Sequence, residues 1–210
     1  MTRPADPATP SGWGRIAVHY DIERWMSCPP VLPAGYDVQS WARTYAEAFS
    51  RRPGFSPTPE LISALAARLA EIHADAYGGG RIVCHLCLIH QPDPLTSPLP
   101  LYLSAWDSRG DRDETLRRLS HADNAAVIQP PYVAEFTARE LGTGLKVRYY
   151  SRHPARPSVL YAGLNYAWRA QELATDLRVF VTTTDLRRLE RALPDIDELM
   201  NVTRIVPSVS

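Results

Sequence analysis

The segment Cys84–His90 contains the residue types best suited to metal or redox chemistry. Cys84 and Cys87 have the Cys-x-x-Cys spacing, and Cys87 and His90 have the Cys-x-x-His spacing. Thiolates and imidazoles at these spacings bind zinc, and a Cys-x-x-Cys pair at a turn or helix start does redox chemistry. The apolar alternation around them predicts a strand instead, on which Cys84 and Cys87 point to opposite faces. The sequence therefore favours buried core cysteines, and no metal is expected.

A second candidate site is a basic stripe on another predicted strand. Between Glu140 and Glu172 the chain has five basic residues and no acidic ones. Strand alternation places four side chains of this region on one face: Lys146, Arg148, Tyr150 and Arg152. Such a stripe can hold phosphate groups or stack bases, as in single-strand nucleic-acid binders. The alternative is a solvated sheet face whose arginines pair with nearby acids.

We expect one sheet face to collect the binding residues. His85 and Cys87 share a face of their own strand, and a pocket there would join them to the basic stripe. The candidate ligand-binding residues are Lys146, Arg148, Tyr150, Arg152, Arg169, His85 and Cys87. An enzyme with a pocket around Arg148, Tyr150 and His85 is one alternative function. Nucleic-acid binding through residues 146–169 is another, disfavoured because the net charge of the chain is zero.

The sequence has no recognised catalytic or nucleotide-binding motif. Gly78, Gly79 and Gly80 follow a predicted helix and precede a strand, the reverse of the order in phosphate-binding loops, so they predict a helix C-cap. His121 comes just past a predicted helix end, where it favourably meets the negative end of the helix dipole. These observations lower the expectation of an enzyme, and no cofactor is expected.

Proline clusters separate the elements that must position these residues, because proline disrupts helices and strands. Helical spacing covers residues 38–49, 59–77, 112–120 and a segment from 186, with a break expected at Pro194 and a capping box from Asp195 to Glu198. Asp37 and Thr58 are the predicted N-caps of the first two helices. Period-two patterns predict strands at residues 81–90, 99–106, 132–138, 144–151, 159–168 and 177–183.

Composition and charge exclude several classes of protein. The chain has 210 residues, 23 basic and 23 acidic side chains, 19 prolines and three cysteines. Zero net charge argues against a polyanion binder that works by bulk charge. No run approaches the roughly 20 apolar residues of a membrane span. The odd cysteine count is not that of a disulfide framework and predicts a cytoplasmic protein. We expect a disordered proline-rich tail at residues 1–14 and a single domain at residues 15–210.

Aromatic residues are numerous enough to line a pocket between the early helices and the sheet. Buried tryptophan and tyrosine side chains also need a hydrogen-bond partner for their N–H or O–H group. A pocket lined by them would suit a small amphipathic ligand or an anchor residue of a protein partner. The residues are Trp25, Trp41, Tyr45, Trp106, Tyr161, Tyr166 and Trp168.

Between about residues 132 and 206, paired predicted strands lead into Thr184-Asp185-Leu186-Arg187-Arg188-Leu189 and a closing Ile205-Val206. This stretch resembles the PsbP-like fold. The resemblance implies an α/β/α sandwich and a binding or assembly role, and it carries over no functional residue.

The order of the predicted elements is two helices, about six strands and a terminal helix. This order predicts an α+β fold, in which N-terminal and C-terminal helices cover a mainly antiparallel β-sheet of about six strands. The expected function is a non-catalytic binding or assembly factor for a protein partner or a small amphipathic or anionic ligand. Homo-oligomerisation is left open.

Overall fold

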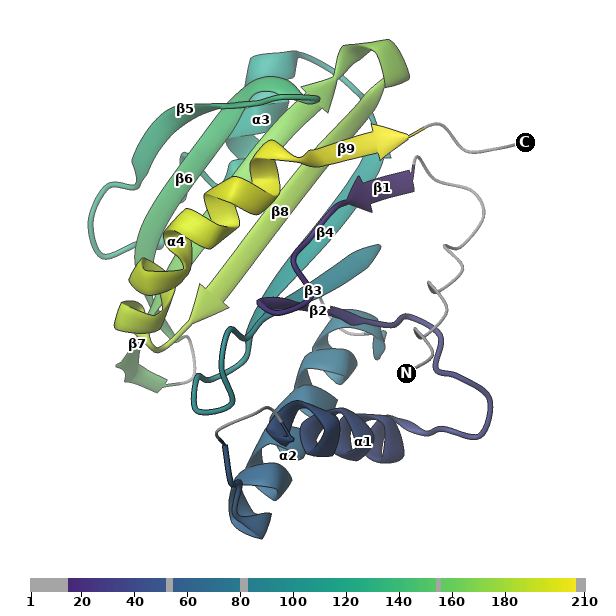
Figure 1. Cartoon of the computed structure of the whole chain (residues 1–210). Helices are drawn as coiled ribbons and strands as arrows, with labels where there is room; N and C mark the ends of the chain where they lie inside the picture. The colour runs from purple at the N-terminus through teal and green to yellow at the C-terminus, as the bar shows by residue number, and fades with distance from the viewer. Residues whose placement is uncertain (1–14, 52–54, 80–82, 154–155, 207–210) are drawn as a thin grey trace.

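The computed structural model describes residues 15–51, 55–79, 83–153 and 156–206 (Figure 1). The predicted tail at residues 1–14 lies outside the described residues. The α-helices are α1 (Val38–Ser50), α2 (Pro59–Tyr77), α3 (Arg112–Ser120) and α4 (Leu186–Asn201), and a short 3-10 helix spans Gln171–Leu173. None of the helices in these ranges is long and apolar enough to span a membrane.

The described strands form two antiparallel sheets. They are β1 (Arg15–Val18), β2 (Trp25–Cys28), β3 (Leu86–His90), β4 (Leu99–Asp107), β5 (Tyr132–Ala138), β6 (Gly142–His153), β7 (Arg156–Ala170), β8 (Thr175–Thr183) and β9 (Thr203–Val206). The larger sheet has seven strands in the order β2-β3-β4-β8-β7-β6-β5, and β1 pairs with β9 in a separate two-stranded sheet. Every pairing is antiparallel.

The predicted fold class, α+β with a mainly antiparallel sheet, is confirmed. The main sheet has seven strands rather than about six. The additional strand, β2, and the outlying β1 have four residues each. A segment this short contains too few alternating positions to be distinguished from a loop.

Helices cover the two faces of the large sheet differently. Figure 1 shows α4 crossing in front of the sheet and α3 behind it. The residues of α4 join the largest core cluster with side chains of β4, β7 and β8, and we refer to this side as the α4 face. On the opposite side, α1 and α2 pack against β2, β3 and β4, and α3 contacts β6 and β7. We refer to that side as the α2/α3 face.

The predicted N-caps of α1 and α2 and the predicted C-cap of α2 are confirmed. The Asp37 carboxylate accepts a hydrogen bond from the Ser40 N–H at 2.7 Å, and the Thr58 hydroxyl accepts one from the Leu61 N–H at 3.3 Å. Gly78 is the C-cap of α2. Side-chain oxygens that satisfy the free N–H groups of the first turn fix where a helix begins.

The predicted break at Pro194 is wrong, because α4 runs through this residue to Asn201. Proline removes one backbone hydrogen bond from a helix interior. Pro194 lies on the exposed side of the helix, where water can satisfy the carbonyl that loses its donor. Asp195 consequently is not a helix cap, and its carboxylate contacts His90 at 2.9 Å and Arg24 at 2.8 Å.

The hydroxyl of Tyr77, the last residue of α2, bridges β2 and β3. It donates to the Cys28 carbonyl at 3.1 Å and accepts from the Cys87 N–H at 3.0 Å. Cys28 and Cys87 are register partners at the end of the β2/β3 ladder. The phenol therefore occupies the place where the two backbones would bond directly, and it ties α2 to the edge of the sheet.

Gly163 makes room for the ring of Tyr149, its register partner on the neighbouring strand. A Cβ atom at position 163 would overlap that ring. We expect Gly163→Ala to lower the free energy of unfolding by about 1–3 kcal/mol, the usual cost of overpacking. Urea-induced unfolding measures this change. In a Tyr149→Ala background the added methyl should cost nothing, and an equal cost in both backgrounds would contradict the assigned contact.

Candidate functional site

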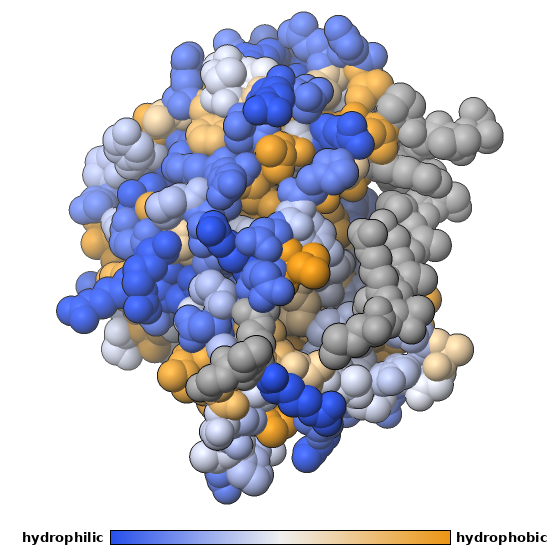
Figure 2. Space-filling model, in the orientation of Figure 1, coloured by the Kyte–Doolittle hydropathy of each residue, from blue (hydrophilic) through white to orange (hydrophobic). Residues whose placement is uncertain are grey.

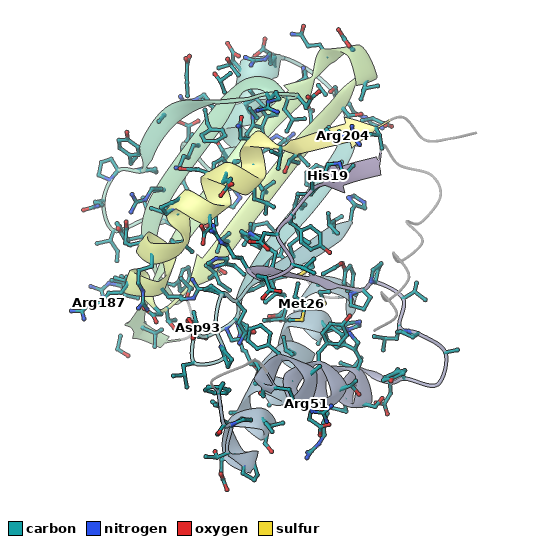
Figure 3. All side chains as sticks on the ribbon, viewed as in Figure 1. His19, Met26, Arg51, Asp93, Arg187 and Arg204 are labelled. Atoms are coloured by element: carbon teal, nitrogen blue, oxygen red, sulfur yellow. The ribbon has the colours of Figure 1, made fainter. Side chains whose placement is uncertain are left out.

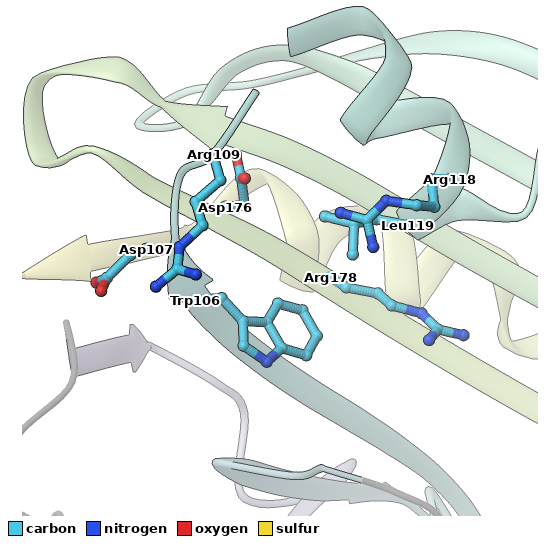
Figure 4. Close-up of a pocket in the computed structure, with 7 residues that line it drawn as sticks. All are labelled: Trp106, Asp107, Arg109, Arg118, Leu119, Asp176 and Arg178. Atoms are coloured by element: carbon cyan, nitrogen blue, oxygen red, sulfur yellow. The ribbon is translucent and has the colours of Figure 1, made fainter. Parts of the chain in front are cut away.

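A cavity of about 550 Å³ lies on the α2/α3 face between β4, β8 and α3 (Figure 4). This volume is within the range of roughly 300–1,000 Å³ that is typical of small-molecule sites. Its walls are lined by Trp106, Asp107, Arg109, Arg118, Leu119, Asp176 and Arg178. We refer to it as the cationic cavity, because three of these residues are arginines.

Arg178 is the half-buried arginine of the cationic cavity. Its guanidinium carbon lies 4.6 Å from the centre of the Phe180 ring, which in turn stacks on Tyr102 at 4.9 Å. This stack holds the guanidinium in one plane through a cation–π interaction. The Arg178 Nε is closed off from solvent and has no hydrogen-bond partner within the described ranges. Arg178 thus presents a positioned cation that has no carboxylate partner among the described residues.

Burial lowers the pKa of Arg178, which means that its charged form lacks full compensation from the protein. Burial also lowers the pKa of His121 at the end of α3, and the nearby Arg178 charge lowers it further. The predicted position of His121 just past a helix end is confirmed, since this residue is the left-handed C-cap of α3, but its lowered pKa does not show the expected favourable interaction with the helix dipole. A guanidinium with no neighbouring carboxylate is an environment that attracts anions.

Arg109 and Arg118 add two more cations to the cavity. Arg109 comes from the loop between β4 and α3, and Arg118 from α3 itself. Neither side chain forms an ion pair with another described residue. Both are exposed, so each by itself contributes less than Arg178.

Asp176 is neutralised by Arg169, which also anchors the loop that carries Arg109. The Arg169 guanidinium donates to both Asp176 carboxylate oxygens, at 2.7 and 3.0 Å, and Asp176 is only 3% exposed. Arg169 further donates to the carbonyls of Arg109 and Gly110 at 3.0 and 2.9 Å. This bidentate pair therefore fixes one wall of the cavity and removes one negative charge from it.

Trp106 supplies the largest apolar surface of the cavity. The ring of His85 lies edge-on to the indole with 6.4 Å between ring centres. The Nδ1 atom of His85 accepts the Ala105 N–H at 3.0 Å, so the neutral ring carries its proton on Nε2. Burial lowers the pKa of His85, which favours this neutral form. His85 is therefore held in place by a backbone hydrogen bond and packs as a neutral ring against Trp106.

The structure places the basic stripe beneath α4. Lys146 Nζ bonds both carboxylate oxygens of Asp197 at 2.6 and 2.7 Å, and Arg148 pairs with Glu190. The pairing with acids expected of a solvated sheet face is therefore found, but this face is covered by α4 and is not solvated. Tyr150 packs against the core of the α4 face. Arg152 is exposed and donates to the Pro157 carbonyl at 2.9 Å.

The expectation that His85 and Cys87 share a face with the stripe is wrong. The strand registers place five directly opposed residues on the α2/α3 face: Cys87, Tyr102, Phe180, Asn165 and Val147. Lys146 and Arg148 flank Val147 on β6, so their side chains point to the α4 face. Arg169 lies on the α2/α3 face with its partner Asp176. No pocket therefore combines Arg148, Tyr150 and His85.

The cysteines belong to the core beneath α1 and α2. Cys28 and Cys87 are fully buried and Cys84 packs against the same cluster. The predicted opposite orientation of Cys84 and Cys87 does not apply, because β3 begins only at Leu86. Burial raises the pKa of the Cys87 thiol, which makes it a poor nucleophile. In the ranges that the structure describes, no group of three His, Cys, Asp or Glu side chains could hold a metal ion.

The prediction that the aromatic residues line one pocket is wrong for most of them. Trp41 and Tyr45 belong to the cluster under α1 and α2, whereas Trp25, Tyr166 and Trp168 lie in the core of the α4 face. Trp106 alone among the predicted aromatic residues lines the cationic cavity.

Sequence reasoning missed Arg178, Arg109 and Arg118. For Arg178 the sequence contains one usable signal: it alternates with the apolar residues Leu177, Val179 and Val181 in a predicted strand. A charged residue within a central strand has to reach either a partner or a cavity.

No protein-family model matches the chain, and no curated protein matches it either. The function is therefore inferred from the cavity and its lining. This lining can bind and orient an anion through guanidinium groups, and it offers a flat apolar surface at Trp106.

Proposed function

We propose that the protein is a non-catalytic binding factor that holds a small anionic ligand in the cationic cavity. The observation that carries this proposal is Arg178, a half-buried guanidinium that stacks on Phe180 and has no acidic partner in the described part of the chain. A carboxylate, sulfonate or phosphate group supplies the acceptors that this cation lacks.

Of the two kinds of partner expected from the sequence, the cavity favours the small ligand. Its lining is concave, mixes apolar and charged side chains, and encloses a volume suited to a small molecule. On the opposite side of the molecule, the basic residues Lys146 and Arg148 are already paired with acids of α4. That side is mostly hydrophilic, with apolar residues in small separate groups (Figure 2).

A cytoplasmic location is part of the same proposal. It is supported by the three cysteines, Cys28, Cys84 and Cys87, which are all free thiols. Unpaired thiols persist in a reducing compartment.

Titration with benzenesulfonate, a planar ring with one negative charge, tests the anion site. Removing one partner of a desolvated charge pair costs about 2–5 kcal/mol, so Arg178→Gln should weaken binding by about 30-fold or more. Two-dimensional NMR of the amide groups measures the affinity and locates the shifted signals around the cavity.

Arg187→Gln is the matched control. Arg187 is an exposed arginine on α4, away from the cavity (Figure 3). The control should bind benzenesulfonate as tightly as the wild-type protein does. Equal affinities of wild-type protein and Arg178→Gln, or shifts confined to other surfaces, would refute the proposed site.

A further inference from the structure

We infer that the ligand of the cationic cavity is a phosphate monoester carried by a planar apolar group. This inference rests on the proposed function and narrows its ligand to one chemical class. Charge balance, the origin of the arginines in three separate elements and the position of Trp106 support it independently of one another.

Charge balance favours a dianion over a monoanion. Asp176 is neutralised by Arg169, so the lining has three arginines, Arg109, Arg118 and Arg178, and one carboxylate, Asp107, that has no ion-pair partner among the described residues. Three guanidinium groups and one carboxylate leave a surplus of two positive charges. A carboxylate or sulfonate neutralises half of that surplus, whereas a phosphate monoester carries a charge of about −1.5 to −2 at neutral pH.

The three arginines come from three separate elements, which favours a tetrahedral group over a planar one. Arg109 comes from the loop after β4, Arg118 from α3 and Arg178 from β8, and all three line the cavity (Figure 4). A carboxylate has two oxygens in one plane and suits a single bidentate arginine. A phosphate monoester has three terminal oxygens that point in different directions, so several guanidinium groups can donate to it together.

Trp106 gives the cavity a flat apolar wall next to the cationic one. The indole lies below Arg109 in Figure 4, and the edge-on contact with His85 fixes its orientation. Leu119 contributes further apolar surface from α3. Planar rings stack favourably on an indole, and such pairs add about 0.5–1.5 kcal/mol beyond the area that they bury. The non-phosphate part of the ligand is therefore a planar ring.

Phenyl phosphate is the smallest probe that combines both features. It is titrated at pH 7.5 into the full chain, beside benzenesulfonate, which has the ring and one charge, and inorganic phosphate, which has the charge and no ring. We expect phenyl phosphate to bind at least tenfold tighter than either. Its advantage over benzenesulfonate should shrink at pH 5, since the second pKa of a phosphate monoester is about 6.

Two variants separate the contributions of charge and ring. Arg118→Gln changes an exposed side chain, so the fold is retained, and it should reduce the preference for phenyl phosphate over benzenesulfonate by at least threefold. Trp106→Phe keeps an aromatic ring of smaller area and should weaken phenyl phosphate while leaving inorganic phosphate unchanged. Arg187→Gln should alter none of these affinities.

The outcomes distinguish this inference from the proposed function. Equal binding of benzenesulfonate and phenyl phosphate at the cavity would overturn the phosphate monoester and leave the anion site in place. Equal binding of inorganic phosphate and phenyl phosphate would overturn the planar ring. If none of the three probes shifts signals of residues that line the cavity, both the inference and the proposed function are wrong.

Discussion

Asp197→Ala is expected to lower the free energy of unfolding by about 3 kcal/mol, because it leaves the Lys146 ammonium without its partner beneath α4. Lys146 Nζ bonds both carboxylate oxygens of Asp197, and the Tyr166 hydroxyl donates to the same carboxylate at 2.5 Å. The Lys146 side chain is 15% exposed and Asp197 is 35% exposed. The partial exposure of Asp197 places the expected loss toward the lower end of the 3–5 kcal/mol typical of a broken buried pair.

A double-mutant cycle tests whether the loss comes from the unpaired charge. Lys146→Met, made alone and in the Asp197→Ala background, removes the ammonium, and replacing both partners by apolar residues is often nearly neutral. The double variant should therefore be more stable than Asp197→Ala by about 2 kcal/mol in urea unfolding. Glu47→Ala, which breaks the exposed Arg43–Glu47 pair, serves as the control and should cost under about 1 kcal/mol. A double variant less stable than Asp197→Ala would contradict this account.

The second large effect expected is a loss of stability on acidification that depends on His90. Arg188 donates to Nδ1 of His90 at 2.8 Å, and Nε2 of His90 contacts Asp195 at 2.9 Å. Burial, followed by the Arg188 charge, lowers the pKa of His90 from 6.5 to about 4. Asp195 opposes this shift, and Arg24, which pairs with Asp195, adds to it.

The lowered pKa means that the unfolded chain binds a proton at His90 more readily than the folded protein does. Stability due to neutral His90 is fully present above pH 6.5 and decreases as the pH falls toward 4. At pH 5 the expected loss is about 2 kcal/mol, since each pKa unit corresponds to about 1.4 kcal/mol.

Urea unfolding at pH 7.5 and pH 5.0 measures this dependence. Burial also lowers the pKa values of His73, His85 and His121. Each of these histidines therefore adds to the loss of stability of the wild-type protein on acidification. His90→Gln removes the contribution of His90 and should reduce the difference between the two pH values by about 2 kcal/mol. His19→Gln, at an exposed histidine (Figure 3), should leave the difference unchanged. An unchanged difference in His90→Gln would show that His90 titrates normally.

The helices and the local faces of strands could be predicted because they depend on neighbours in the sequence. Apolar spacing and cap residues predict α1 and α2. Strand alternation correctly places Lys146 and Arg148 on the face of the sheet opposite to Val147. These properties need no knowledge of which strands pair.

The relative orientation of distant strands could not be predicted in this way. Whether His85 shares a face with Lys146 depends on every register between β3 and β6, and a shift of one residue in any of them inverts the answer. Of these registers, the one between β4 and β8 is the hardest to predict, because these strands are separated in the sequence by α3 and three further strands. The cationic cavity has the same origin, since Trp106 and Arg178 become neighbours only through that pairing.

The hydroxyl of Tyr77 has a consequence for how the molecule opens. Because it completes the last rung between Cys28 and Cys87, separation of β2 from β3 at this end requires either that both hydrogen bonds of Tyr77 break or that α2 also moves. Local fluctuations that would fray an edge strand by itself are thereby coupled to a helix of 19 residues with its own buried contacts. We therefore expect the edge of the sheet and the α1/α2 layer to open as one cooperative unit, although Tyr77 joins them through a single side chain.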